Sequence, residues 1–112
     1  MQRVIDKKPD PKLLDDLVRR IVEVAHPQRI ILFGSAAREE MGPNSDLDVL
    51  VVVPDGVPKR KTTQEIYLNM WGFGFAKDII VATVSDIVNY GSNPYLIYKQ
   101  ALEEGRVLYH AT

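Results

Sequence analysis

The segment RIILFGSAAREEMGPNSDLDVLVVV, residues 29–53, determines the fold of this chain. It contains two apolar runs, residues 29–33 and 47–53, each as long as a typical buried β-strand. Gly34 breaks the first run, and we expect a short helix over residues 36–41 before the second run begins. The second run is apolar at consecutive positions, as in a strand that is covered on both faces. The segment therefore predicts two strands of a sheet, the second of them covered on both sides or central in the sheet.

The rest of the chain alternates between helical and extended patterns. Asp10 and Pro11 are a favourable N-cap and first residue for a helix, and Pro27 ends that helix. Thr62 and Glu65 match a capping box. The further expected elements are a helix over residues 63–70, a strand over 76–83, a helix over 86–90 capped by Ser85, a helix over 93–102 followed by Gly105, and an edge strand over 107–109. This order predicts an α/β (α+β) fold, in which helices pack on a small mixed β-sheet.

The composition limits the classes of function. The chain has 112 residues, which suits a single domain spanning residues 1–112. Its formal net charge of −1 provides no general attraction for nucleic acid, so direct nucleic-acid binding is not expected. It has no cysteine, which excludes disulfides, thiolate metal sites and cysteine nucleophiles. The N-terminus is charged and the longest apolar run, residues 49–53, is too short to cross a bilayer, so we expect a cytoplasmic protein without a membrane anchor.

Two carboxylates, Asp46 and Asp48, open the second apolar run. Alternate residues of a strand point to the same side, and their Cα atoms would lie roughly 6.5–7 Å apart. Without a cation the two charges would repel each other, and one carboxyl group would tend to keep its proton. A hard divalent cation such as Mg²⁺ would keep both ionised, because carboxylate oxygens are its preferred ligands. A turn or capping role beside Asn44 is the alternative for Asp46.

A glycine–serine bend follows the first apolar run. Gly34 allows the backbone to approach a phosphate group closely, and a helix that begins there would offer free N–H groups to an anion. The hydroxyl of Ser35 adds one more donor. Such bends are common in proteins, so this one gains meaning only from its combination with the two carboxylates.

The combination of a strand, Gly34-Ser35, a spacer and Asp-x-Asp on the next strand resembles the signature of the polymerase-beta-like nucleotidyltransferase superfamily. The segment is most similar to its small bacterial and archaeal branch, the minimal nucleotidyltransferases or MNT proteins, whose loop commonly reads Gly-Ser-x-Ala-Arg-Gly. Ala37 and Arg38 match this loop. Glu39 replaces its last glycine and adds a negative charge near the expected phosphate site.

The resemblance implies a third carboxylate on a neighbouring strand. Asp78, at the head of the strand predicted over residues 76–83, is the matching position. The resemblance further implies that Asp46, Asp48 and Asp78 are catalytic and hold two Mg²⁺ ions, with Asp78 accepting the proton of the attacking hydroxyl. A solvated strand end is the alternative for Asp78.

For the nucleotide, the resemblance implies that Gly34 and Ser35 bind the β- and γ-phosphates of ATP and that Arg38 steadies the triphosphate. An exposed helix position without a role is the alternative for Arg38. The implied reaction is Mg²⁺-dependent transfer of AMP to a hydroxyl group (AMPylation), with release of pyrophosphate.

The resemblance also implies a partner, because MNT proteins pair as antitoxins with helical HEPN-domain toxins and transfer AMP onto a tyrosine of the toxin. We therefore expect a protein adenylyltransferase in a hetero-oligomer with a HEPN-domain toxin. The alternative is a non-catalytic antitoxin that neutralises its partner by binding alone, in keeping with Glu39 and the small size of the chain. Transfer to a small molecule would need an acceptor pocket that no segment is long enough to build.

Two further stretches stand apart from this pattern. The basic run Lys59-Arg60-Lys61 is interpreted as a solvated loop, with contact to an acidic partner or to nucleic acid as the alternative. In the stretch MWGFGF, residues 70–75, aromatic residues alternate with glycine. We expect these aromatic side chains to pack in the core, with a surface for a partner or a nucleotide base as the alternative.

Overall fold

The computed structural model describes residues 4–5 and 7–112, and a four-stranded mixed β-sheet forms its centre. The strands lie in the order β5-β4-β3-β6. β4 and β5 run parallel, whereas β3 pairs antiparallel with both β4 and β6. The predicted α/β fold with a small mixed sheet is confirmed. The strand bounds are β3 Arg29–Phe33, β4 Leu47–Val53, β5 Lys77–Thr83 and β6 Arg106–His110.

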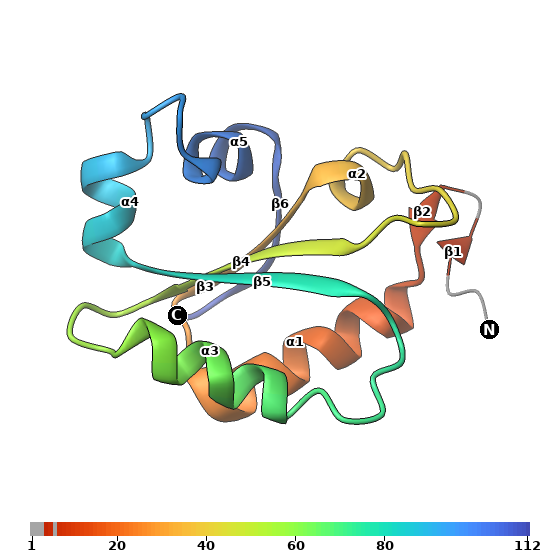
Figure 1. The fold of residues 1–112 in the computed structure, drawn as a ribbon, viewed down its shortest axis with the longest axis horizontal. Helices are drawn as coiled ribbons and strands as arrows, with labels where there is room; N and C mark the ends of the chain where they lie inside the picture. The colour runs from red at the N-terminus through yellow and green to blue at the C-terminus, as the bar shows by residue number, and fades with distance from the viewer. Residues whose placement is uncertain (1–3, 6) are drawn as a thin grey trace.

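The helices cover both faces of this sheet (Figure 1). α1 and α3 lie on one face, and α2, α4 and α5 lie on the other. A short antiparallel pair that the sequence did not predict, β1 (Val4–Ile5) with β2 (Lys8–Pro9), precedes α1. The helix bounds are α1 Pro11–Ala25, α2 Gly34–Ala37, α3 Lys59–Leu68, α4 Val84–Tyr90 and α5 Ile97–Glu104.

The alternation of side chains along β4 assigns each residue to one face of the sheet. Val49 and Val51 belong to the larger core, which packs against α1 and α3. Leu50 and Val52 belong to the smaller core beneath α4 and α5. Because alternate residues share a face, Asp48 lies on the same side as Leu50 and Val52, toward α5. The two apolar sets thus fix the direction in which the acidic side chain points.

Helix α1 and strands β3 and β4 follow the prediction closely. The side chain of Asp10 accepts a hydrogen bond from the Lys12 N–H at 2.9 Å, with Pro11 as the first helical residue. The helix ends at His26, which adopts a left-handed backbone conformation with φ 44°. The runs predicted as strands became β3 and β4 because each is mainly apolar and bounded by a turn.

Helix α2 is shorter than predicted and begins earlier. It occupies Gly34–Ala37, whereas the prediction was residues 36–41. The Arg38 N–H bonds to the Gly34 carbonyl at 3.2 Å and closes its one turn. Glu39 then adopts a left-handed conformation, φ 58°, in which a right-handed helix cannot continue.

Helix α3 also begins earlier than predicted, and the expected capping box is wrong. The helix starts at Lys59 after Pro58, which has an extended backbone and no side-chain cap. The Thr62 N–H donates to the Pro58 carbonyl at 3.0 Å, so Thr62 already lies inside the helix. Its side chain is buried and does not cap the helix. The basic run is therefore helical, and the interpretation of residues 59–61 as a loop is wrong.

The ends of α4 and α5 differ from the prediction for local reasons. Thr83, not Ser85, caps α4: its hydroxyl accepts from the Asp86 N–H at 3.1 Å, and the Asp86 carboxylate accepts from the Thr83 N–H at 2.9 Å. α5 begins at Ile97 because the side chain of Asn93 bonds to the backbone and holds a turn before it. β5 and β6 agree with the predicted strands to within one residue at each end.

Across the part of the chain that the structure describes, no helix combines the length and the apolar character that a bilayer span needs.

Candidate functional site

The first residues of β4 and β5 bring two of the predicted acids side by side. Asp48 and Asp78 are register partners in the parallel pair, and neighbouring strands lie about 4.8 Å apart. Both side chains point to the α5 side of the sheet, because each lies two residues before a member of that face, Leu50 or Ile80. Asp46 immediately precedes β4 at the same edge. The structure therefore brings all three predicted acids to one corner of the sheet.

Burial and an excess of negative charge both act on Asp48 at this corner. Partial burial raises the pKa of the Asp48 carboxyl, and the nearby charges of Asp78 and Asp46 raise it further, while Arg38 opposes them. Asp46 and Asp78 are exposed, and Asp48 is half-buried. When burial and neighbouring like charges raise the pKa of a carboxyl group, a bound cation stabilises its ionised form.

The donor set fits a hard divalent cation by its chemistry. Within residues 4–5 and 7–112, no three His, Cys, Asp or Glu side chains are already arranged to hold a metal ion. Asp48 and Asp78 are nevertheless adjacent, and the exposed side chains of Asp46 and Asp78 have room to turn toward a shared ion. Carboxylate oxygens are the ligands that Mg²⁺ prefers. Asp48 with Asp78 is therefore the pair that could begin a Mg²⁺ site, with Asp46 as its third member.

The glycine–serine bend lies against these acids. Phe33 at the end of β3 is the register partner of Asp48, so Gly34 follows directly at the acidic corner. Gly34 has φ 71°, and a Cβ atom added to it would overlap Asp48 Oδ2. Glycine is required here for both reasons. Ser35 is half-buried in the single turn of α2, next to this contact.

Arg38 lies close enough to the acids to influence Asp48, but acidic neighbours also hold it. Its Nε lies 3.4 Å from Glu40 Oε1, and its Nη1 lies 3.8 Å from Glu104 Oε2 of α5. All three side chains are at least two-fifths exposed, and such ion pairs contribute about 1 kcal/mol or less. A phosphate group could therefore replace either carboxylate on Arg38. Sequence reasoning missed Glu104, because no local pattern links it to Arg38.

Glu39 occupies a backbone conformation that suits glycine. Its φ of 58° lies in the left-handed region, and its carboxylate lies 3.7 Å from the Lys8 amine of β2. Its side chain is therefore engaged by the N-terminal strand pair. The backbone keeps the turn that glycine would make, at the cost of some strain.

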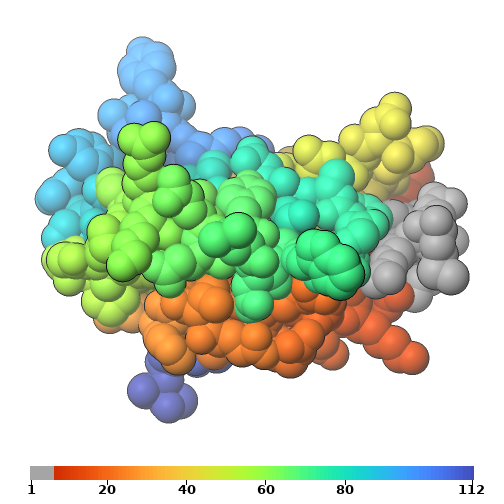
Figure 2. All heavy atoms as spheres, turned by 60° about the horizontal axis from the view of Figure 1, so that its bottom comes forward, coloured from red at the N-terminus to blue at the C-terminus, as the bar shows by residue number. Residues whose placement is uncertain are grey.

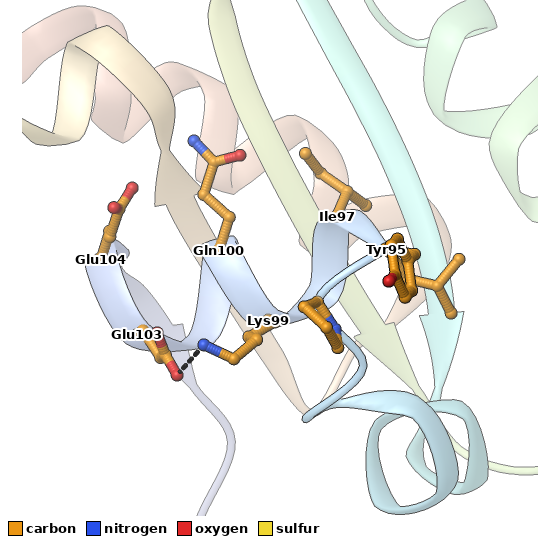
Figure 3. A pocket seen from close by; sticks show the side chains of 8 residues that line it. Tyr95, Ile97, Lys99, Gln100, Glu103 and Glu104 are labelled. Carbon is orange, nitrogen blue, oxygen red and sulfur yellow. Dashed lines mark ion pairs between the residues drawn. The ribbon is translucent and has the colours of Figure 1, made fainter.

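A surface hollow of about 400 Å³ borders this region along α5 (Figure 3). Lys99 and Glu103 form an ion pair of 2.7 Å at one side of it. Glu104 belongs both to this hollow and to the pair with Arg38, so the hollow adjoins the loop after β3. Its remaining lining residues are Pro94, Tyr95, Leu96, Ile97 and Gln100.

Comparison with known families identifies the domain. A family model described as a nucleotidyltransferase domain matches residues 11–108. The chain belongs to the nucleotidyltransferase domain family. The matched range includes the bend after β3 and all three acids.

Two solved structures resemble the nucleotidyltransferase domain described here. One is a provisionally named nucleotidyltransferase from Sulfolobus solfataricus, with a TM-score of 0.60 and 18% identity over 88% of this chain and 78% of that one. The other is a toxin–antitoxin crystallised with AMP-PNP, with a TM-score of 0.59 and 17% identity over 88% of this chain and 74% of that one. At these identities the likeness shows the fold alone. No curated protein matches the sequence.

Proposed function

We propose that this protein is a Mg²⁺-dependent adenylyltransferase that transfers AMP from ATP to a hydroxyl group of a partner protein. The observation that supports the proposal most strongly is the register pairing of Asp48 with Asp78 beside Gly34. The proposal assigns the metal ligands and the catalytic roles to Asp46, Asp48 and Asp78. Bound Mg²⁺ would supply charge neutralisation for the triphosphate and would lower the pKa of the attacking hydroxyl.

In the proposed reaction, the residues of the chain bind and orient the triphosphate. The backbone of Gly34 and the hydroxyl of Ser35 contact the β- and γ-phosphates, and Arg38 exchanges its carboxylate partners for phosphate oxygens. Charge that develops on the leaving pyrophosphate is then stabilised by donors that are already in place.

The transfer itself is an in-line displacement at the α-phosphorus. The acceptor oxygen forms the new P–O bond as the bond between the α-phosphorus and the α,β-bridging oxygen breaks, and pyrophosphate leaves. Asp78 takes the proton of the acceptor hydroxyl, because it is an exposed carboxylate at the edge strand and can be reached from outside.

We infer that the acceptor belongs to a HEPN-domain toxin and that the protein acts as its antitoxin in the cytoplasm. The structural likeness to a toxin–antitoxin crystallised with an ATP analogue supports this inference at the level of the fold. The acidic corner lies on an open sheet edge, which suits an acceptor presented by another protein.

The proposal is tested by incubating the purified protein with ATP labelled at the α-phosphate, MgCl₂ and a candidate HEPN-domain protein from the adjacent reading frame. We expect label on the HEPN protein, and at least about a hundredfold less label with Asp48→Asn or Asp78→Asn. Asp15→Asn removes an exposed carboxylate of α1 and serves as the control, with unchanged transfer. Equal transfer by all four proteins, or none by the folded wild type, would refute the proposed activity.

A second candidate, neutralisation by binding alone, is favoured by one specific observation. Arg38 is occupied by Glu40 and Glu104, which would compete with a nucleotide. The double variant Asp46→Asn/Asp48→Asn separates the two candidates. If it still relieves growth arrest by the HEPN protein and binds it as tightly as the wild type, binding suffices. If relief is lost while binding is retained, the enzymatic proposal holds.

A further inference from the structure

Two features that the proposed reaction does not use lie on α3 and on the turn that follows it. They are the basic run at its start and the aromatic residue that follows its end, Trp71. Residues at intervals of three and four along this helix, continued by Trp71 in the turn after it, form one exposed stripe. We name this stripe the α3 surface, and it consists of Arg60, Lys61, Gln64, Tyr67, Leu68 and Trp71, all of them exposed.

The apolar part of the α3 surface is unusually accessible. Leu68 is 81% exposed and Trp71 is 89% exposed. A hollow of about 470 Å³ lies here, lined by Thr63, Gln64, Tyr67 and Leu68 and mostly apolar. In Figure 2 the outer side of α3, in green, faces the viewer, and no other element lies over it. Exposed apolar surface of this kind is typical of a protein interface.

The exposure of Trp71 does not come from a loose turn. The side chain of Arg20 donates hydrogen bonds to the carbonyls of Asn69 and Trp71, at 3.1 and 2.7 Å. The Asn69 amide in return donates to the Arg20 carbonyl at 2.9 Å. Phe73, two residues on, is fully buried and lies under the Arg20 guanidinium. The turn is thus held against α1 while the indole points outward, an arrangement that lowers the entropy cost of binding.

The basic part of the α3 surface conflicts with the helix itself. Arg60 and Lys61 lie with Lys59 in the first turn, where the helix dipole disfavours positive charge, and this turn has neither an acidic residue nor a side-chain cap. Lys59 pairs with Asp86 at 2.9 Å. Arg60 and Lys61 have no ion-pair partner among the residues that the structure describes. A local conflict of this kind is expected where a binding partner supplies the missing charge.

We propose that the α3 surface docks a partner protein that places an apolar side chain in the hollow beside Leu68 and acidic side chains on Arg60 and Lys61. Lys61 and Leu68 are seven helical residues apart, so the acidic groups lie about 10 Å from the apolar anchor. By charge complementarity, the partner that binds this surface presents a face that is acidic and partly apolar. The identity of the partner, the HEPN-domain toxin, rests on the proposed function.

The position of the α3 surface is compatible with transfer at the acidic corner. α3 lies on the sheet face opposite to the one that Asp48 occupies, so a docked partner does not cover the acids (Figure 1). The Trp71 end of the helix leads through residues 72–76 into the start of β5, where Asp78 lies. A partner held at Trp71 thus lies at the same end of the sheet as the acids.

The test compares two double variants that remove equally exposed apolar side chains. Leu68→Ser/Trp71→Ser alters the α3 surface. Val88→Ser/Tyr95→Ser alters the α4–α5 region, where the two residues are 77% and 92% exposed, and serves as the control. We expect the first variant to bind the HEPN protein at least about tenfold more weakly and the second to bind it like the wild type. Because Trp71 is the only tryptophan, 5-fluorotryptophan labelling gives one ¹⁹F signal that shifts on docking.

The charge part is tested separately with Arg60→Glu/Lys61→Glu. We expect weaker binding of the HEPN protein, with affinity partly restored by a lysine in place of an acidic residue on the partner face. A 20-nucleotide single-stranded RNA is the second probe. Tighter binding of this RNA than of the HEPN protein, lost in the charge variant, would overturn the proposal in favour of nucleic acid.

The outcomes separate this inference from the proposed function. If Leu68→Ser/Trp71→Ser and the wild type bind the HEPN protein with equal affinity, the docking role of the α3 surface is overturned and the proposed activity is not. Unchanged binding with no AMP transfer overturns the enzymatic activity only. Self-association of the wild type that Leu68→Ser/Trp71→Ser abolishes, without HEPN binding, overturns the inference in favour of a second copy of the chain.

Discussion

Asp48 and Asp78 are direct neighbours across the parallel strands β4 and β5, and the backbone of Gly34 lies against the first of them. Three segments that are far apart in the sequence thus meet at one corner of the sheet. The partial burial of Asp48 and the charges of Asp78 and Asp46 all raise the pKa of Asp48, which makes the corner a place where a cation would be stabilising.

Replacing Gly34 with alanine should disturb this corner. The new Cβ would overlap Asp48 Oδ2, and φ 71° is unfavourable for alanine. We expect Gly34→Ala to lower the free energy of unfolding by about 2–3 kcal/mol and to weaken ATP binding. Gly56→Ala is the matched control, because Gly56 has φ 88° but no atom close to where a Cβ would lie, and about 1 kcal/mol is expected there. If urea unfolding shows the same loss of stability for Gly34→Ala and Gly56→Ala, the overlap with Asp48 is not the cause.

Placing glycine at position 39 should stabilise the protein. Glu39 has φ 58°, and its ion pair with Lys8 is exposed, so the relief of strain outweighs the lost pair. We expect Glu39→Gly to raise the free energy of unfolding by about 0.5 kcal/mol and to tighten ATP binding. Glu39→Gln removes the charge and keeps the strain, so it should tighten binding without stabilising. A Glu39→Gly protein less stable than Glu39→Gln would refute this explanation of the turn.

Freeing Arg38 from α5 should improve nucleotide binding. Glu104→Gln removes one carboxylate that competes with phosphate for Arg38, and we expect ATP affinity to rise about two- to fivefold. Glu103→Gln is the control on the preceding residue, because Glu103 pairs with Lys99 instead. Calorimetric titration with ATP and MgCl₂ measures both. If ATP affinity rises equally in both variants, the loss of one negative charge is responsible and the release of Arg38 is not.

The cap of α4 should make stability depend on pH in the acidic range. The Thr83 N–H and the Lys59 amine hold the pKa of Asp86 below its ordinary value of 3.8. Because the folded-state pKa is the lower one, the stabilisation is fully present above that ordinary value and is lost as the pH falls through the folded-state pKa. Asp86→Asn should cost about 1 kcal/mol at pH 7 and progressively less near pH 3. Urea unfolding at both pH values checks this, and a constant difference would contradict it.

Local sequence patterns predicted the elements that depend on local chemistry. β3 and β4 are mainly apolar runs, and α1 has an N-cap at Asp10, so their bounds follow from the sequence. The start of α3 does not follow from the sequence. Thr62 and Glu65 match a capping box, but the chain is already helical from Lys59.

Features that depend on distant contacts could not be predicted from patterns. The expectation of core packing for residues 70–75 is confirmed for Phe73 but wrong for Trp71, because Gly72 and Gly74 have φ of 78° and 76° and turn the chain. The pairing of Asp48 with Asp78 depends on the parallel register of β4 and β5. The sequence patterns did not predict this register, and the resemblance implied only that Asp78 lies on a neighbouring strand. The contact of Glu104 with Arg38 has no signal in the sequence at all.

Metal-dependent nucleotide binding at the acidic corner is tested most directly by a calorimetric titration of AMP-PNP into the protein, with and without MgCl₂. The three proteins to compare are the wild type, Asp48→Asn/Asp78→Asn and the control Asp15→Asn. We predict Mg²⁺-dependent binding by the wild type and the control, and at least about tenfold weaker binding by the double variant. Binding of equal affinity by all three proteins, or binding that does not respond to Mg²⁺, would contradict the role assigned to these acids.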